Sequence, residues 1–162
     1  MDITLKNVKH MASLSEETHC YSADLYVDGM KWGEVSNRGH GGPDDFHGVG
    51  GKGWRDIEAL NARIAAELPP YTNYGMTLEQ DLEMVCGEIV NQHLVAKDFK
   101  RAMRAKVLWL DPAKPGLWGF AVPKGSTARE VVDRIRRSGA GVGRHYLVDM
   151  PESEALAAYA GS

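Results

Sequence analysis

Residues 21–28 carry the pattern that most constrains the fold of this chain. Apolar and polar side chains alternate there, which places the two sets on opposite faces of a β-strand. The expected core-facing set is Tyr21, Ala23, Leu25 and Val27. Asp28-Gly29 then supplies the two positive-φ residues that a type I′ turn requires. The pattern predicts a β-hairpin, and its two-residue turn predicts that Leu25 lies opposite Trp32 on the core face.

Hydrophobic spacing and capping signals predict the remaining elements. We expect strands over residues 3–8, 106–110, 117–122 and 145–149, and helices over residues 54–68, 77–104, 127–138 and 153–159. Two of these helices open with the spacing of a capping box, at Thr77/Gln80 and at Thr127/Glu130. Hairpins dominate over strand-helix-strand units, which predicts an α+β fold with a mostly antiparallel sheet packed against two to three helices. Since no Gly/Ser/Pro-rich linker interrupts the chain, we expect a single domain over residues 1–162.

Composition excludes several classes of protein. Of the 162 residues, 43% are hydrophobic and 25% are charged, which does not fit a collagen-like, coiled-coil or mainly disordered chain. No ten-residue run is uniformly apolar, and Asp2 stands where a signal peptide carries basic residues, so we expect a cytoplasmic protein without a membrane segment. Cys20 and Cys86 share no metal-binding or redox spacing, which indicates buried free thiols.

Charge is strongly segregated along the chain. Residues 97–144 hold twelve Lys and Arg against four Asp and Glu, although the whole chain has a net charge of -3. Four of these residues recur at i, i+3, i+4 and i+7 of the second helix and form a cationic stripe: Lys97, Lys100, Arg101 and Arg104. The third helix and the loop after it add Arg129, Arg136, Arg137 and Arg144.

Such a surface can neutralise nucleic-acid phosphates or dock an acidic protein patch, and the competing interpretation is an ordinary solvated helix face. We expect the nearby Trp109, Trp118 and Phe120 to be buried in the core, which argues against a surface on which single-stranded nucleic acid stacks.

Residues 39–53 contain seven of the eighteen glycines, and this density predicts a loop without helix or strand. Because a helix follows from Trp54, the loop amides could cradle a phosphate-bearing ligand. The loop is also the expected second contact with a partner, through His40 and Lys52. No Walker or dinucleotide-binding spacing is present. The loop also holds His40, Asp44, Asp45 and His47. Imidazoles and carboxylates suit a divalent metal or an acid/base pair, whereas the simpler interpretation is a structured surface loop.

A resemblance adds context to these patterns. Residues 25–29 (Leu-Tyr-Val-Asp-Gly), residues 36–44 (Ser-Asn-Arg-Gly-His-Gly-Gly-Pro-Asp) and residues 106–110 (Lys-Val-Leu-Trp-Leu) resemble an uncharacterised family of small proteins from bacterial phages, plasmids and prophages. The family has no known activity, so the resemblance implies no catalytic residue. It implies a setting in which accessory proteins of mobile elements bind and block host factors, including immune systems.

The sequence therefore favours a non-enzymatic binding protein without metal or cofactor. We expect it to inhibit a host nucleic-acid-handling or defence complex by masking its surface, with a host protein or nucleoprotein complex as its partner. The alternative is a small metal-dependent or acid/base hydrolase, or a nucleotide-binding protein, built on residues 39–53, with catalytic or ligand roles for His40, Asp44, Asp45 and His47.

Overall fold

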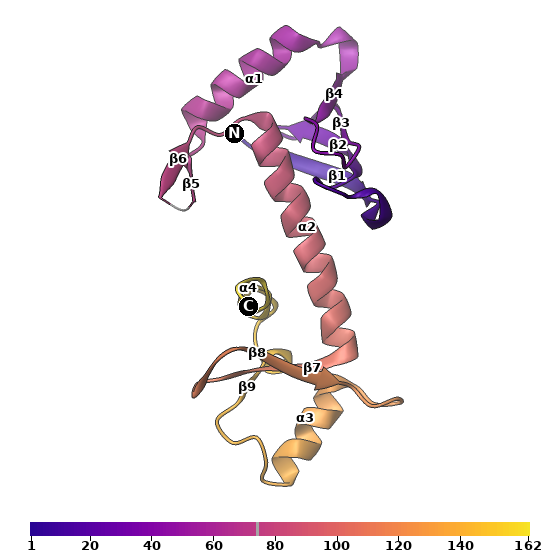
Figure 1. The fold of residues 1–162 in the computed structure, drawn as a ribbon, viewed down its shortest axis with the longest axis vertical. Helices are drawn as coiled ribbons and strands as arrows, with labels where there is room; N and C mark the ends of the chain where they lie inside the picture. The colour runs from indigo at the N-terminus through magenta and orange to yellow at the C-terminus, as the bar shows by residue number, and fades with distance from the viewer. Residues whose placement is uncertain (74) are drawn as a thin grey trace. The chain divides into compact units, whose positions relative to one another are not determined.

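The computed structural model describes residues 1–73 and 75–162 (Figure 1). The chain divides into two compact units, the N-terminal unit of residues 1–91 and the C-terminal unit of residues 92–162, and the division falls inside one helix. All strand pairs of the described residues are antiparallel, which confirms the α+β class. The single domain expected over residues 1–162 stays a prediction, because a compact unit need not unfold independently. Within these residues, no helix combines the length and the apolar character needed to cross a bilayer.

The N-terminal unit contains a four-stranded sheet of order β1-β2-β3-β4, a short hairpin and two helices. Its strands and α-helices are β1 (Ile3–His10), β2 (Tyr21–Val27), β3 (Met30–Asn37), β4 (Asp45–Gly48), α1 (Trp54–Glu67), β5 (Tyr71–Asn73), β6 (Met76–Leu78) and the first part of α2 (Leu82–Ala105). Short 3-10 helices lie at Ala12–Leu14 and Val49–Gly51. The most deeply buried side chains are Leu25, Val35, Ile64, Leu82, Cys86 and Val90, which come from the sheet, α1 and α2. Both thiols, Cys20 and Cys86, are buried and free, as predicted.

The predicted hairpin is confirmed, but its register is different. Asp28 and Gly29 have φ values of 50° and 80°, and the alternate residues of β2 are buried. A β-bulge shifts the pairing, so that Leu25 lies opposite Gly33 and Tyr26 lies opposite Lys31. The prediction that Leu25 faces Trp32 is therefore wrong: Trp32 is the extra residue of the bulge. The bulge keeps Trp32 in the core, where it is 8% exposed.

Two further boundaries differ from the predictions. Residues 45–48 form β4 against β3, because the glycines of the 39–53 segment mostly flank this stretch and Gly48 pairs with Gly33. A Cβ at Gly33 would lie 2.2 Å from the His47 carbonyl oxygen, so glycine there permits the close pairing. Part of the expected loop is thus an edge strand.

The second helix begins later than its apparent capping box indicated. Thr77 lies in β6, and the side-chain amide of Gln80 donates to the Pro69 carbonyl at 2.6 Å. Asp81 caps α2 instead, since its Oδ1 accepts from the Met84 amide at 2.8 Å. The turn predicted around residues 73–75 includes Tyr74, which lies outside the described residues.

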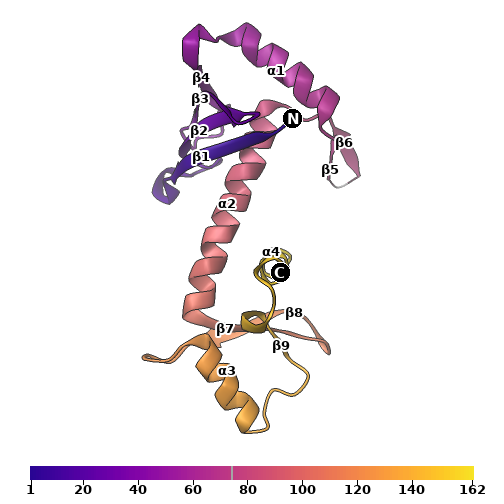
Figure 2. The same cartoon turned by 180° about the vertical axis from the view of Figure 1, so that it is seen from behind.

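The C-terminal unit places helices on both faces of a three-stranded sheet of order β8-β7-β9 (Figures 1 and 2). Besides the end of α2, its elements are β7 (Lys106–Asp111), β8 (Lys114–Ala121), α3 (Ala128–Arg137), β9 (His145–Tyr146), a 3-10 turn (Leu147–Asp149) and α4 (Glu152–Ala160). Phe99 and Ala102 of α2 pack with Leu108 and with α4 on one face, while α3 packs with Val107 and Tyr146. Adjacent residues of a strand point to opposite faces, so α2 and α3 cover different faces of the sheet.

Local signals in the C-terminal unit are partly confirmed. Thr127 and Glu130 form the predicted capping box of α3, with reciprocal hydrogen bonds of 2.8 and 3.3 Å. The last strand is shorter than expected, because the chain turns into a 3-10 helix at Leu147. The prediction that Trp118 and Phe120 are buried in the core is wrong: both lie on the edge strand β8 and are 44% and 40% exposed. Trp109 on the central strand is half-buried.

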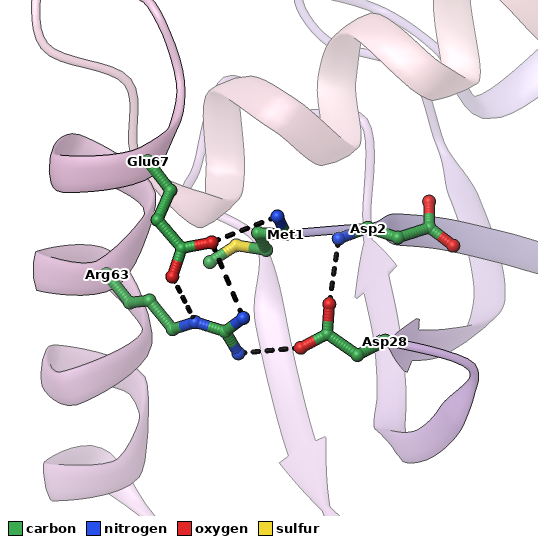
Figure 3. Close-up of polar contacts among 5 residues, drawn as sticks. All are labelled: Met1, Asp2, Asp28, Arg63 and Glu67. Carbon is green, nitrogen blue, oxygen red and sulfur yellow. Dashed lines mark hydrogen bonds and ion pairs between the residues drawn. The ribbon is translucent and has the colours of Figure 1, made fainter.

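An ion-pair network joins α1 to the β2–β3 turn and to the start of the chain (Figure 3). Arg63 contacts Asp28 Oδ2 at 2.7 Å and Glu67 Oε1 at 2.6 Å. Glu67 also lies 2.9 Å from the Met1 amino group, and the Asp28 carboxylate accepts from the Asp2 amide at 2.9 Å. These contacts lower the pKa of Asp28, chiefly through the Asp2 amide, and lower the pKa of Glu67, chiefly through Arg63.

We expect Arg63→Met to lower the Tm by a few degrees and to weaken the acid sensitivity of folding. Carboxylates with a depressed pKa stabilise the fold above their unfolded pKa of about 4 and lose this contribution as the pH falls. The variant should therefore lose less stability than the wild type between about pH 5 and pH 3. Thermal unfolding across this range measures it, with Arg55→Met on the same helix as the control. Parallel curves for Arg63→Met and the wild type would contradict the assigned role of the network.

Candidate functional site

The four basic residues of α2 form a solvent-facing cluster, which we call the cationic ridge: Lys97, Lys100, Arg101 and Arg104. All four side chains are exposed, while Phe99 and Ala102 between them are buried. Arg101 contacts Asp98 of the same helix at 3.1 Å. Across residues 1–73 and 75–162, the structure shows no ion pair to Lys97, Lys100 or Arg104. Three of the four charges therefore face solvent without an acidic partner.

The arginines predicted beyond α2 do not extend this ridge. Arg129 and Arg136 of α3 both bind Asp149, at 3.1 and 2.6 Å. Arg129 also donates to the Val148 carbonyl at 2.5 Å. These contacts attach α3 to the 3-10 turn and explain both arginines as parts of the packing of the unit.

The remaining two arginines have separate local contacts. Arg137 donates to the Asp133 carbonyl of its own helix at 3.2 Å, and the Arg144 guanidinium lies 4.7 Å from the centre of the Trp109 ring. Because α3 and α2 cover different faces of the sheet, the eight predicted basic residues form two surfaces, of which the cationic ridge is one.

The four residues of the alternative catalytic prediction have different surroundings. His40 contacts Glu16 at 3.2 Å, and Asp45 lies 3.9 Å from Arg38. His47 lies on β4 opposite Glu34, and Asp44 points into a pocket. In the described part of the chain, no three His, Cys, Asp or Glu side chains are placed to hold a metal ion together.

The predicted phosphate cradle before α1 is already occupied by an acid of the chain itself. The Asp56 carboxylate accepts from the Gly53 amide at 2.8 Å at the N-terminus of α1. Its negative charge offsets the partial positive charge of the helix end and so weakens attraction for a second anion. Lys52 donates to the Val49 carbonyl at 3.3 Å within its own turn.

Asp44 lies in a pocket of the N-terminal unit with a hydrogen-bonded wall. The pocket is lined by residues 15–19, Tyr21, Asn37, Asp44, Glu83, Gly87 and Val90. Tyr21 donates its hydroxyl to Asp44 Oδ2 at 2.5 Å, and the Asn37 amide donates to Asp44 Oδ1 at 2.9 Å. Thr18 in turn donates to Asn37 Oδ1 at 2.8 Å. Tyr21 and Asn37 are only 3% and 7% exposed, so the wall is rigidly placed.

Burial dominates the electrostatics of this pocket. It raises the pKa of Asp44, and the nearby carboxylates of Asp45 and Asp81 act in the same direction, against the hydrogen bonds from Tyr21 and Asn37. Burial and the bond to Asp44 also raise the pKa of Tyr21, which keeps its hydroxyl protonated as a donor. The pKa of Glu83 is raised by burial and by the charge of Asp44. A carboxyl that protonates more readily than usual can exchange a proton with a bound molecule.

Sequence patterns had singled out only Asp44 of this pocket. Its partners, Tyr21 and Asn37, are paired across β2 and β3. The register predicted without a bulge would set Tyr21 opposite Ser36, one residue away from its true neighbour. The signal that could have found the pair was a polar Asn at the end of a strand, opposite the first core-facing residue of the strand before it.

Comparison of the chain with known protein families, with curated proteins and with solved structures finds no match in any of the three. The fold and the two candidate sites therefore carry the functional argument.

Replacing Asp44 by Asn should change how stability depends on pH. A carboxyl whose folded pKa is raised costs stability when ionised, and the cost is relieved as the pH falls toward the ordinary value of about 4. We expect the free energy of unfolding of the wild type, relative to Asp44→Asn, to increase between about pH 7 and pH 4. Urea unfolding at several pH values measures this difference.

The control for this experiment is Asp45→Asn, which makes the same substitution at the exposed neighbouring residue and retains Asp44. It should keep the gain in stability on acidification. Curves for Asp44→Asn and the wild type that stay parallel over the whole range would show that Asp44 is not the titrating group.

Proposed function

We propose that this chain is a non-enzymatic binding protein that inhibits a host nucleic-acid-handling or defence complex by covering part of its surface. The contact is made by the cationic ridge of α2, which meets an acidic patch of the partner. The mobile-element origin and the host target rest on the resemblance of residues 25–29, 36–44 and 106–110 to the phage and plasmid family.

The observation that carries this proposal is the exposure of the cationic ridge, in which Lys97, Lys100 and Arg104 form no ion pair within the described residues and only Arg101 pairs with an acid, Asp98. Exposed like charges on one helix face repel one another, and the buried side chains of this part of α2 are Phe99 and Ala102, so core packing does not account for the gathering of charge. On α3 of the same unit, by contrast, Arg129 and Arg136 both pair with Asp149. The ridge thus places three basic side chains without an ion pair among the described residues on one face of one helix.

Charge distribution between the units supports the same function. The C-terminal unit holds twelve Lys and Arg against seven Asp and Glu, a net charge of +5, while the N-terminal unit holds seven against fifteen, a net charge of -8. A partner with an acidic patch is attracted by one unit and repelled by the other. This asymmetry orients the encounter and speeds association at low salt.

Charge reversal on the ridge tests the proposal. The triple variant Lys100→Glu, Arg101→Glu, Arg104→Glu should weaken partner binding by about tenfold or more and should flatten its salt dependence. The measurement is affinity capture from a bacterial lysate at low and at high salt, followed by mass spectrometry and by titration of the captured complex.

The matched control reverses three exposed charges elsewhere in the same unit: Lys106→Glu, Lys124→Glu, Arg134→Glu. It alters the net charge equally and should retain most of the binding. Equal binding by the wild type and the ridge variant, or equal loss in both variants, would refute docking through the ridge. Capture of partners with no role in nucleic-acid handling or defence would refute the assigned target.

The pocket around Asp44 favours a second candidate function, a small acid/base hydrolase or nucleotide-binding protein. A raised pKa suits Asp44 to donate a proton, while His19 and Glu83 also line the pocket. Nucleotide hydrolysis by the purified chain, lost in Asp44→Asn and kept in Asp45→Asn, would support this function. Turnover unaffected by Asp44→Asn, or no turnover of nucleotides, would count against it.

A further inference from the structure

The edge strand β8 presents two aromatic side chains that stay partly exposed, Trp118 at 44% and Phe120 at 40%. Trp118 and Phe120 are two residues apart and therefore point to the same face of the sheet. Cross-strand pairing sets Trp118 beside Trp109 and Phe120 beside Val107. The rings of Trp109 and Phe120 are 5.8 Å apart and tilted by 59°. We call Trp109, Trp118 and Phe120 the aromatic platform.

Gly119, between the two rings, allows β8 to pair closely with the central strand β7. It points to the opposite face, where a Cβ would lie 2.6 Å from Cδ2 of Leu108 and 3.0 Å from the Val107 carbonyl oxygen. A larger residue would force the Leu108 side chain to move and would press on the Val107 carbonyl oxygen. The sequence Trp118-Gly119-Phe120 thus places two exposed rings side by side on a closely paired strand.

Positive charges border the platform. The Arg144 guanidinium lies 4.7 Å from the Trp109 ring centre, and the Lys114 ammonium lies 5.9 Å from that of Trp118. Asp111, at the turn between β7 and β8, accepts from the Ala113 amide at 3.0 Å. A cation on an exposed aromatic face is held weakly, so Lys114 can move to a phosphate when a base stacks on Trp118. Arg144 lies on the half-buried Trp109, beside the rings that are left for stacking.

We propose that the aromatic platform binds single-stranded nucleic acid, with bases stacked on Trp118 and Phe120 and phosphates held by Lys114 and Arg144. Exposed rings bordered by basic side chains are the combination that binds single strands without base-specific hydrogen bonds. A duplex hides its base faces and can use only the charges. The net charge of +5 on this unit supplies the attraction for phosphates.

Other occupants fit the platform less well. An acidic protein patch would use the charges but leave the rings in water, and a second copy of this chain would bring the same basic residues against themselves. The platform goes beyond the proposed function and is a separate surface, because α2 packs on the face of the sheet opposite to Trp109. Each surface can therefore be removed without the other.

Fluorescence anisotropy with a labelled oligo(dT) of about 15 nucleotides, and with the matching duplex, tests the platform. The wild type should bind the single strand more tightly than the duplex. Trp118→Ala and Phe120→Ala should each raise the Kd for the single strand by about tenfold, with little change for the duplex. Trp118→Phe, which keeps a ring, should retain most of the affinity.

Three further variants separate stacking from other effects. Phe120→Leu retains apolar bulk beside Trp109. If it weakens single-strand binding as much as Phe120→Ala does, the loss of affinity is due to the missing ring and not to unfolding. Trp54→Ala removes a 71% exposed ring of the N-terminal unit and should change nothing. The triple ridge variant should keep the preference for single strands over duplex even where it weakens binding overall. Failure of the ridge proposal is thus distinguishable from failure of the platform.

Two results would overturn the proposal. One is equal binding of single strand and duplex by the wild type, or no binding of either. The other is unchanged single-strand affinity in Trp118→Ala and Phe120→Ala. A dimer in sedimentation that these substitutions convert to a monomer, with no effect on oligonucleotide binding, would assign the platform to a second copy of the chain.

Discussion

Packing of α2 against the sheet of the C-terminal unit decides which of its side chains reach solvent. Phe99 and Ala102 are buried with Leu108 and α4. A helix turns about 100° per residue, so burial of these two positions directs Lys97, Lys100, Arg101 and Arg104 outward. The cationic ridge is therefore a consequence of core packing. Its four charges are fixed in spacing by the helix and in direction by the residues between them.

The same sheet explains how one unit can carry the two surfaces that we propose for binding. Its central strand β7 is covered by α2 and α4 on one face and by α3 on the other. α3 packs against Val107 and Tyr146, and β8 at the edge keeps Trp118 and Phe120 exposed. A ridge that offers charge alone suits a protein patch, whereas rings with charge suit single strands. Both surfaces are compatible with the proposed target, a nucleic-acid-handling complex.

Much of the fold could be predicted because local signals agreed with tertiary structure. The alternation over residues 21–27, the Asp28-Gly29 turn and the Thr127/Glu130 capping box needed no knowledge of distant neighbours. Other predictions failed where a distant contact decided the outcome. The bulge at Trp32 keeps that ring in the core, and Thr77 joined a hairpin although its spacing fits a helix cap.

The candidate sites also differ in whether local sequence signals were enough to predict them. Helical spacing alone gave the cationic ridge, since its four residues belong to one helix. The pocket around Asp44 could not be read from the sequence, because it joins β2, β3 and the segment before β4 through a register that the bulge alters. The exposure of Trp118 and Phe120 could not be predicted either, because a strand pattern does not indicate which part of the sheet a helix covers.

Acylation of lysines in the free protein and in its captured complex shows whether the cationic ridge is the contact surface. If the protein docks through α2, Lys97 and Lys100 react readily in the free chain and become protected in the complex, while Lys31 of the N-terminal unit reacts equally in both. Equal reactivity of the two ridge lysines with and without the partner would contradict docking through α2.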